Sequence, residues 1–404
     1  MTLRCGVRTA WAVAVAAAAW LVLPAWASST FTVAPGQSLA QAVQQAADGD
    51  VIELLTGVHR GQVAVLVQRR LTVRGTAGGR RPVLLADGQS AEGKAIIVVR
   101  GGSVQIENLE FRGARVPDHN GAGIRLDRGQ LWVRNCAFFD NQNGILAGNV
   151  DDAELSVENS AFGQAPPNTT LPHLIYVGRI ARFVLQGSHL SGGLNGHLVK
   201  SRARVNEVRY NHLVDGAAGR ASYELEFPNG GSATVVGNVI AQGEHSSNPA
   251  IVSFGAEGDV PAAEPRVLRV HSLVLINNTL VNSGWRPAQF VRVHEDRLRS
   301  PVMQRWVNNL FVGLGVADVV WADLALGNYP ALAVALRNPA QGDFSLHASS
   351  LLRGRGIAPQ DLDNRPDNGP DRALRALWPT AEFSPPLGSR PLSELKQWSP
   401  GAHQ

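Results

Sequence analysis

One repeated pattern runs through most of this chain and limits the folds that it can adopt. Each copy has a strand-like half with alternating apolar residues, then Asn or Gly near the fifth or sixth place, and then an apolar residue. The last residues of successive copies lie 27, 24, 28, 23, 27, 40 and 31 positions apart. A strand, a bend and a second short strand follow from this pattern. The copies are VQIENLEF (104–111), LWVRNCAF (131–138), LSVENSAF (155–162), FVLQGSHL (183–190), NEVRYNHL (206–213), ATVVGNVI (233–240), LVLINNTL (273–280) and QRWVNNLF (304–311).

A second series of strand-like runs lies between these copies, in a constant order. Strands repeated in coils of roughly 25 residues describe a solenoid in which each coil pairs only with its neighbours, at about 4.8 Å. Asn and Gly tolerate the left-handed backbone conformation at little cost, so a tight bend between strands selects them repeatedly. Stacked coils of this kind predict an asparagine ladder. The second series reads GIRLD, GILAG, LIYVG, HLVKS, YELEF, AIVSF and FVRVH.

This arrangement resembles the right-handed parallel β-helix of the pectate-lyase-like superfamily, over roughly residues 30–350. The period predicts the all-β solenoid, and its right-handedness is what the resemblance implies. The opening FTVAPGQSLAQAVQQAADGDVIEL is similar to the start of many such proteins, with Ser38 and Gln41 as a capping box and Gly49 after a helix. We expect this helix, over about residues 38–48, to cover the open first coil.

Three segments are expected along the chain. Residues 1–27 contain Arg4 and Arg8, then an apolar run that ends in AWA, which is typical of a secretory signal. An uncleaved membrane anchor is the alternative, and the alanine-rich run broken by a proline disfavours it. Residues 28–358 would form the solenoid, and the Pro-rich residues 359–404 would pack on its outside. The sequence therefore predicts an exported protein, periplasmic or extracellular.

Charge and cysteine content exclude some functions. Removing Arg4 and Arg8 from the 37 basic residues leaves 35 against 33 acidic residues, a net charge of about +2 that is too small for bulk nucleic-acid affinity. Any preference for an anionic ligand must therefore be local. Cys136 is the one cysteine left after the signal, so no internal disulfide is expected, and it is predicted to be a small buried apolar residue. A monomer is expected.

The second strand series carries the candidate site. An unpaired charge does not stay inside a fold, so the charged positions predict which side of these strands faces solvent. His197 would face inward in a regular strand, and a bend would put it outside. Glu257 comes from the insertion GAEGDVPAAEPR (255–266), which would form a wall beside this face. The predicted outward residues are Arg125, Tyr176, Lys200, Glu224, Glu226 and Arg292, with His173, Arg179, Arg202 and His294 near the edge.

A sharper resemblance is to the chondroitinase B and alginate lyase group. In that group a strand ending in Lys-Ser is followed by an Asn-containing strand and then by a strand bearing Leu-Arg-His-Gly, with the lysine as base and the arginine supporting the substrate. Of these residues, only the lysine has a counterpart in this sequence, at Lys200. Glu226 stands where the arginine would be, and Asn195 and His197 lie where that group carries calcium-binding acids. The segments in the matching order are KS (200–201), NHL (211–213) and LEFPNG (225–230).

The lyase interpretation makes definite chemical demands. Removing a proton next to a uronate carboxylate needs a cation to neutralise the carboxylate and a base within hydrogen-bond reach. Lys200 is the predicted base, with Arg202, Arg204 or Arg179 as the neutralising cation. A lysine base must lose its proton near neutral pH, which nearby arginines favour and nearby carboxylates oppose.

Other uses of the face stay open. Lys200 and the glutamates would form an ion-pair ladder across coils, worth about 0 to 1 kcal/mol per exposed pair, in a non-catalytic glycan-binding or envelope protein. Glu224 and Glu226 lie about 6.8 Å apart along their strand, near the lower end of the carboxyl spacing of inverting glycosidases, about 6.5 to 9.5 Å. The same pair would suit calcium, and no other cofactor is indicated. The expected partner is an acidic polysaccharide or another glycan.

Overall fold

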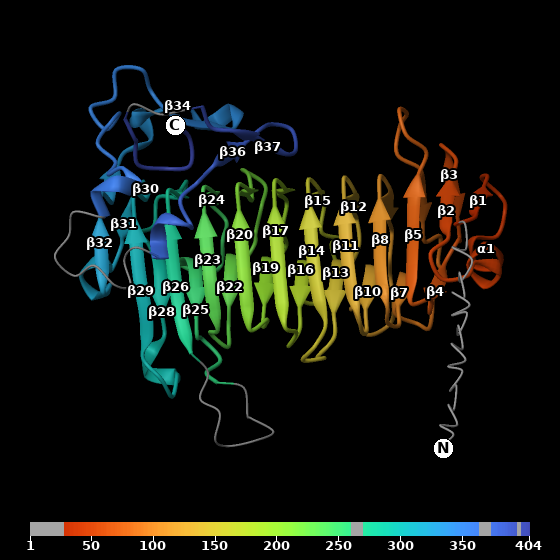
Figure 1. Ribbon diagram of the computed structural model, residues 1–404. Coiled ribbons are helices and arrows are strands. Elements are labelled where there is room, and N and C mark those ends of the chain that lie inside the picture. Colours follow the sequence, from red (N-terminus) through yellow and green to blue (C-terminus); the bar gives the residue numbers. More distant parts are fainter. Residues whose placement is uncertain (1–27, 260–269, 363–372, 394–396) are drawn as a thin grey trace, which may run out of the picture.

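The computed structural model describes residues 28–259, 270–362, 373–393 and 397–404, and its strands wind into one solenoid with three parallel sheets (Figure 1). Each full coil contributes one strand to each sheet. The repeated pattern of a strand, a bend and a short strand supplies sheets I and III, and the second series supplies sheet II. The paired strands within these three sheets run parallel. The predicted all-β solenoid is therefore confirmed.

The three sheets are built from the following strands. Sheet I consists of β1 (Thr30–Val33), β2 (Val51–Leu54), β5 (Arg70–Gly75), β8 (Ser103–Glu107), β11 (Gln130–Arg134), β14 (Glu154–Glu158), β17 (Arg182–Gln186), β20 (Val205–Arg209), β23 (Ser232–Val236), β26 (His271–Ile276), β29 (Val302–Val307) and β32 (Leu324–Leu326). Sheet II consists of β4 (Ala64–Leu66), β7 (Ala95–Val99), β10 (Ala122–Leu126), β13 (Asn143–Ala147), β16 (His173–Val177), β19 (His197–Ser201), β22 (Tyr223–Phe227), β25 (Ala250–Phe254), β28 (Ala288–Val293) and β31 (Gly315–Val316). Sheet III consists of β3 (Val58–Arg60), β6 (Val83–Leu85), β9 (Glu110–Arg112), β12 (Ala137–Phe139), β15 (Ala161–Gly163), β18 (His189–Leu190), β21 (His212–Val214), β24 (Val239–Gln242), β27 (Thr279–Asn282), β30 (Leu310–Val312) and β33 (Tyr329–Ala331).

The interior is a stack of apolar side chains, because equivalent residues of successive coils point inward at the same register. Phe111, Phe138 and Phe162 occupy one such place in β9, β12 and β15, with ring centroids 4.9 and 4.6 Å apart. Cys136 is buried in the same core, and burial raises the pKa of its thiol to about 12. It therefore packs as a small apolar residue.

The bends between sheets I and III have positive φ, as the recurrent Asn and Gly predict. Asn108, Asn135 and Asn159 have φ values of 55°, 51° and 49°. Tyr210 takes the same conformation, with φ of 55°, although it is neither Asn nor Gly. Its hydroxyl accepts a hydrogen bond of 3.0 Å from the backbone N–H of Thr380, in the C-terminal segment.

The residue after each bend forms the ladder. The backbone N–H of Asn211 donates to Oδ1 of Asn238 in the next coil, over 2.9 Å, and that of Asn238 donates to Asn278, over 3.0 Å. The ladder amides also donate to backbone carbonyls of the preceding coil. In earlier coils Ser160 and Ser188 take this place with a single hydroxyl. The predicted asparagine ladder is present, one position after the bend itself.

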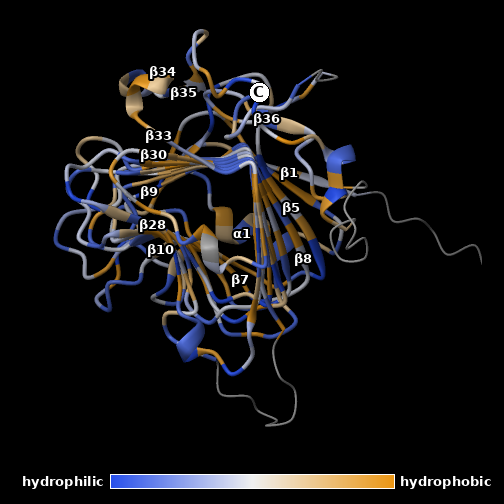
Figure 2. Cartoon of the chain, turned by 90° about the vertical axis from the view of Figure 1, so that its left-hand side faces the viewer, coloured by the Kyte–Doolittle hydropathy of each residue, from blue (hydrophilic) through white to orange (hydrophobic). Residues whose placement is uncertain are grey.

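The first coil is covered by α1 (Leu39–Gln45), which lies across the end of the solenoid when the molecule is viewed along its axis (Figure 2). The Ser38 hydroxyl accepts a hydrogen bond of 3.2 Å from the backbone N–H of Gln41, and Leu39 and Val43 are buried against the core. The helix is shorter than the expected span of residues 38–48. The predicted signal segment lies outside the described residues. In the part of the chain that is described, no helix combines the length and hydropathy needed to cross a membrane.

The C-terminal segment packs on the outside of sheet I. Leu362, Leu374 and Trp378 form a second apolar cluster with outward residues of β23 and β26, among them Val236 and Ile276. The remaining elements are the strands β34 (Leu336–Asn338), β35 (Asp343–Leu346), β36 (Ala381–Phe383) and β37 (Ser389–Pro391), and the 3₁₀ turns η1 (Glu295–Arg297), η2 (Val319–Trp321), η3 (Ala333–Ala335), η4 (Pro339–Gln341) and η5 (Pro359–Leu362).

Candidate functional site

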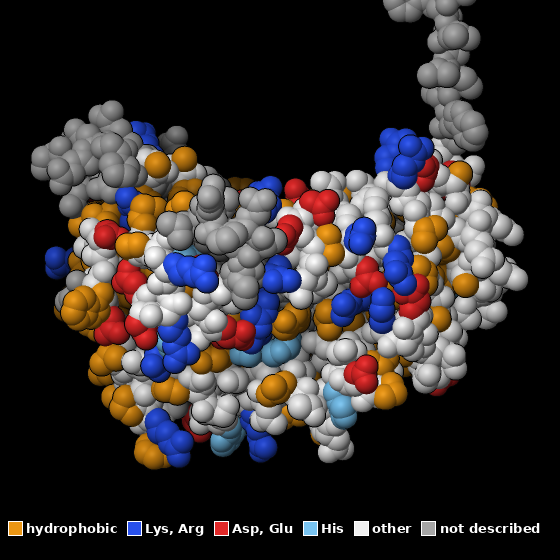
Figure 3. Space-filling model, turned by 90° about the horizontal axis from the view of Figure 1, so that it is seen from below, with side chains coloured by type: hydrophobic (Ala, Val, Ile, Leu, Met, Phe, Trp, Pro, Cys, Tyr) orange, Lys and Arg blue, Asp and Glu red, His pale blue; other side chains and the backbone are white. Residues whose placement is uncertain are grey.

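The outer face of sheet II aligns polar side chains from successive coils. Lys200 of β19 stands in register with Tyr176 of β16 on one side and with Glu226 of β22 on the other. Arg125 and Arg292 occupy the same row further along the solenoid. Figure 3 views this side of the molecule, where cationic, acidic and imidazole side chains are interspersed over the middle of the solenoid. Register therefore brings the strand-borne part of the predicted site together.

Lys200 is held between two carboxylates. Its Nζ lies 2.8 Å from Oε1 of Glu257 and 3.2 Å from Oε2 of Glu226. The lysine side chain is 12% exposed and that of Glu226 is 4% exposed. These are not the solvated pairs of an exposed ladder, because the strands and the Glu257 loop remove most of the surrounding water.

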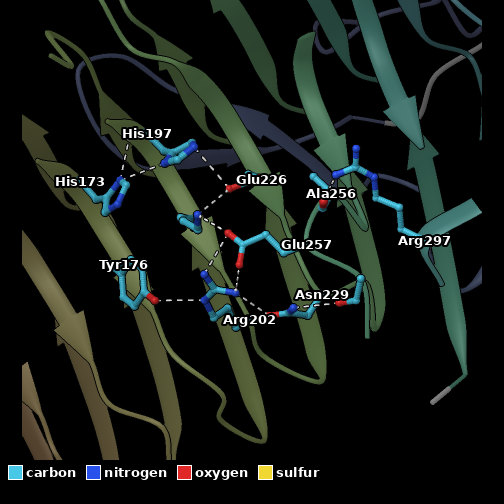
Figure 4. Close-up of polar contacts among 11 residues, drawn as sticks. His173, Tyr176, His197, Arg202, Glu226, Asn229, Ala256, Glu257 and Arg297 are labelled. Carbon is cyan, nitrogen blue, oxygen red and sulfur yellow. Dashed lines mark hydrogen bonds and ion pairs between the residues drawn. The ribbon is translucent and has the colours of Figure 1, made fainter. Parts of the chain in front are cut away.

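Arg202 approaches the same carboxylate from the edge of the sheet (Figure 4). Its guanidinium lies 2.7 Å from Oε2 of Glu257 through one terminal nitrogen and 3.0 Å from Oε1 through the other. Its Nε donates to the Tyr176 hydroxyl over 3.0 Å, and it donates to Oδ1 of Asn229 over 2.7 Å. Lys200 and Arg202 thus converge on one carboxylate, with Tyr176 and Asn229 orienting the arginine.

The Glu257 carboxylate is presented by a tight turn after β25. The backbone N–H groups of Gly255 and Glu257 donate to the carbonyls of Phe227 and Pro228, each over 2.8 Å, and Gly258 closes the turn onto Gly255. Burial alone would raise the pKa of the Glu257 carboxyl, but hydrogen bonds from the two cations outweigh it and lower the pKa to about 2. Glu257 is therefore ionised at neutral pH.

Two imidazoles extend the site beside Lys200. Nδ1 of His173 accepts the backbone N–H of His197 over 3.0 Å and lies 3.0 Å from Nδ1 of His197. Since Nδ1 of His173 is an acceptor, we assign the proton between the two rings to Nδ1 of His197. Burial lowers the pKa of His173 to about 3 and that of His197 to about 2, so both rings are neutral at neutral pH.

The Glu226 carboxyl lies at the other ring nitrogen of His197. Nε2 of His197 lacks a hydrogen in the tautomer just described, and it lies 3.3 Å from Oε2 of Glu226. Oε2 is buried and receives no well-directed hydrogen bond. Burial raises the pKa of the Glu226 carboxyl, and the opposing charge of Lys200 does not cancel this effect. A protonated Glu226 that donates to His197 satisfies both atoms.

The predicted outward orientation of Glu224 is wrong. β19 and β22 pair through His197 with Tyr223 and through Val199 with Leu225, but the residues between them are unpaired, which marks a bend. The bend turns Glu224 into the solenoid interior, where it is fully buried and neither of its carboxyl oxygens has a hydrogen-bond partner among the described residues. Burial, followed by the Asp215 charge, raises its pKa well above the ordinary value.

The same bend places His197 on the outside, as the sequence allowed. Tyr223 stacks on its ring, with centroids 5.1 Å apart and planes at 5°, and His173 stacks on the other side at 4.7 Å. His173 in turn stacks against Tyr176 at 5.3 Å. Sequence reasoning missed Tyr223 and Asn229. Strict alternation with Glu226 outward puts Tyr223 on the inner face, and only the bend brings its ring outside.

Several predicted residues lie outside this cluster. Arg125 is paired instead with Asp127, at 2.9 Å. Arg204 and Arg292 are exposed and Arg179 is half-buried, and none of the three forms an ion pair with another described residue. His294 is buried at the end of β28, and burial lowers its pKa. Arg202 is thus the one predicted neutralising cation that meets Lys200 at a shared carboxylate.

The predicted calcium pair does not form. Glu224 points into the solenoid and Glu226 points out of it, so the two cannot chelate one ion together. Within the described residues no group of three or more His, Cys, Asp or Glu side chains is arranged to hold a metal ion.

Comparison with solved structures matches this geometry to a known fold. Pectate lyase Pel9A superposes with a TM-score of 0.50 at 15% sequence identity, covering 82% of this chain and 92% of that one. The chain has the right-handed parallel β-helix fold of the pectate-lyase-like type. An alginate lyase from Paenibacillus sp. str. FPU-7 matches at 14% identity with a TM-score of 0.48, covering 76% of this chain and 99% of that one. No protein-family model matches the sequence. No curated protein matches it either.

Proposed function

We propose that this protein is an exported polysaccharide lyase that cleaves a uronate-containing chain by β-elimination on the outer face of sheet II. The observation that carries the proposal is the convergence of Lys200 and Arg202 on a single carboxylate, with all three contacts between 2.7 and 3.0 Å. A uronate presents this group next to the carbon that loses its proton. Elimination requires a cation on that carboxylate and a base beside it.

Arg202 is the proposed neutralising cation. Two of its nitrogens contact the two oxygens of the Glu257 carboxylate, and hydrogen bonds to Tyr176 and Asn229 fix the orientation of the guanidinium. A preorganised guanidinium stabilises the negative charge that develops on a uronate carboxylate as the neighbouring proton leaves. Arg204 and Arg179, the other candidates from the sequence, form no contact of this kind with another described residue.

Lys200 is the proposed base. The proton of the carbon next to the carboxylate would pass to Nζ, a carbon–carbon double bond would form, and the glycosidic carbon–oxygen bond would break. The leaving oxygen then takes a proton from water. The Lys200 Nζ lies at the same carboxylate that Arg202 contacts, which is where a base beside the uronate carboxylate is needed.

Aromatic and imidazole rings supply the sugar-binding surface in this proposal. Tyr176, His173, His197 and Tyr223 stack in series across three strands beside Lys200. Because these rings stack on one another, their edges rather than their faces line this surface, and the two neutral imidazoles add no charge that would compete for the uronate. A chain lying along the solenoid axis would pass successive sugars over successive coils.

The test is an assay for unsaturated sugar ends by ultraviolet absorbance on alginate, pectate and glycosaminoglycans, with and without calcium. Lys200→Ala should abolish product formation. Glu226→Gln should keep it, because Glu226 is neither the base nor the neutralising cation and glutamine can still hydrogen-bond to His197. Arg204→Ala is the matched cation control and should not change the rate. Silence of the native protein across the whole panel would refute the lyase.

A glycosidase is the second candidate, through a different pair from the one the sequence suggested. The environments of Glu226 and Glu257 move their pKa values in opposite directions, which is typical of an acid and its ionised partner. Both contact the same Lys200 nitrogen, so the contacting oxygens lie at most about 6 Å apart, close to the 5 to 5.5 Å of retaining enzymes. Hydrolysis without ultraviolet product, lost in Glu226→Gln, would favour this reading.

Glycan binding without turnover is the third outcome. A protein that retains an acidic polysaccharide in the same panel but releases no ends of either kind would be a non-catalytic module. Lys200→Ala would then weaken retention, because the cationic side of the site would lose one of its two members.

A further inference from the structure

We propose that the Glu257 side chain stands in for the substrate carboxylate when no ligand is bound, and that binding a uronate requires it to swing out of a preformed carboxylate subsite. The subsite consists of Lys200 and Arg202, with Tyr176 and Asn229 as positioning residues. This inference rests on the proposed function for the identity of the sugar, but the carboxylate subsite itself is testable without any enzymatic activity.

The subsite has the form of a carboxylate receptor. Arg202 meets both oxygens of the carboxylate, and Lys200 meets one of the same two oxygens at 2.8 Å. Charge-assisted contacts in this fork arrangement match the planar, two-oxygen shape of a carboxylate. Tyr176 and Asn229 occupy the other donors of the guanidinium, so its orientation does not depend on Glu257.

Exposure identifies Glu257 as the removable member of the cluster. Its side chain is 42% exposed, against 12% for Lys200 and 17% for Arg202. The cations are therefore reached from solvent on the side that Glu257 covers. Figure 4 shows the Glu257 side chain extending from its turn to Arg202, to which dashed lines join its carboxylate.

The displacement needs only side-chain rotation. The turn backbone is fixed on both sides, because Glu257 N–H donates to Pro228, the Gly258 carbonyl accepts from Asn229, and the Ala256 carbonyl accepts from Arg297. A pinned backbone with a half-exposed side chain permits a change of rotamer on a fast timescale without opening the turn.

Charge balance makes the exchange selective. The two cations share the ionised Glu257 carboxylate, and replacing that carboxylate by a uronate conserves the charge of the site. A neutral sugar would leave the displaced cations without a partner in a poorly hydrated site, which is costly. The subsite therefore selects a carboxylated sugar over its neutral counterpart.

Sodium acetate is the probe for the empty subsite. Glu257→Ala should expose the two cations, so its thermal midpoint should rise progressively with acetate relative to equal sodium chloride, by mass action. The native protein should show no such difference, because its own carboxylate fills the subsite. Glu244→Ala, which removes an exposed glutamate from the neighbouring insertion, should behave as the native protein does. An acetate-insensitive Glu257→Ala protein would overturn the inference.

Calorimetry with trigalacturonate and trimannuronate tests the exchange itself. Glu257→Gln keeps the side-chain size and removes the competing charge, so it should bind at least one of these oligomers about tenfold or more tightly than the native protein does. Equal affinity in the two proteins would overturn the stand-in role. If the acetate effect appears and no polysaccharide is cleaved, the carboxylate subsite is supported and the lyase proposal is refuted. If polysaccharide is cleaved but Glu257→Gln and the native protein bind the oligomers equally well, the lyase proposal is supported and the stand-in role of Glu257 is refuted.

Discussion

Replacing Glu224 should stabilise the protein, and increasingly so as the pH rises. Its carboxyl is fully buried inside the solenoid, and neither oxygen has a hydrogen-bond partner within the described part of the chain. The residues at the same place in the neighbouring strands, Leu198 and Ile251, belong to the apolar core. Glu224→Leu would continue that apolar row. Removing an unsatisfied buried polar group and burying a leucine should together stabilise the fold by about 2 to 4 kcal/mol.

The pH dependence follows from the raised pKa of Glu224 in the folded state. Below its ordinary value of 4.5 the carboxyl is protonated in both states, and the native protein is least penalised. As the pH rises above 4.5 the unfolded chain releases the proton while the folded chain keeps it. The free energy of unfolding should therefore fall by about 1.4 kcal/mol per pH unit from this group until the folded pKa is reached.

Denaturant unfolding at several pH values between 4 and 8 would measure this effect, with tryptophan fluorescence and circular dichroism as probes. The difference between Glu224→Gln and the native protein should be small at pH 4 and should widen steadily. Glu244→Gln, on an exposed loop, is the matched control and should follow the native curve. Parallel curves for Glu224→Gln and the native protein at all pH values would refute the assignment of a protonated interior carboxyl.

Two further predictions concern the ladder and the imidazoles. Asn238→Ala should destabilise the fold by about 3 kcal/mol or more in the same unfolding assay, because it removes side-chain hydrogen bonds to two neighbouring coils. Asn120→Ala, on an exposed loop and outside the left-handed region, should change stability little. The rings of His173 and His197 should remain neutral from pH 8 down to about pH 4, since burial lowers their pKa to about 3 and 2; ring carbon shifts in nuclear magnetic resonance would reveal a titration near pH 6.5 if this is wrong.

The coil could be predicted from the sequence because its causes are local and repeated. A left-handed bend needs Asn or Gly in nearly every coil, and the spacing of those residues counts the coils. Tyr210 is neither Asn nor Gly, but the repeated pattern on both sides of it still predicts a bend at this position. The position of the ladder was less accessible, because bend and ladder residues are adjacent and often both Asn.

The site was harder to predict because two of its determinants are not periodic. Strict alternation puts Glu224 and Glu226 on one face, and the bend in β22 that separates them depends on how neighbouring strands stack rather than on YELEF itself. The insertion after β25 was recognisable as a wall from its length. That Glu257 would meet both Lys200 and Arg202 depends on the path of the turn, which sequence alone does not specify.

The change from serine to asparagine along the ladder divides the solenoid into loosely and firmly fastened coils. The hydroxyls of Ser160 and Ser188 each accept one hydrogen bond from a backbone N–H of the preceding coil. Each hydroxyl donates its own hydrogen bond to a backbone carbonyl two residues earlier, within the same coil. From Asn211 onward, each amide adds a bond to a carbonyl of the preceding coil. Local opening should therefore begin in the N-terminal coils and stop near Asn211, which lies between β19 and β22. The coils that carry Lys200 and Glu226 are among the first of this more rigid part. The N-terminal coils can therefore open locally while the geometry of the site is unchanged.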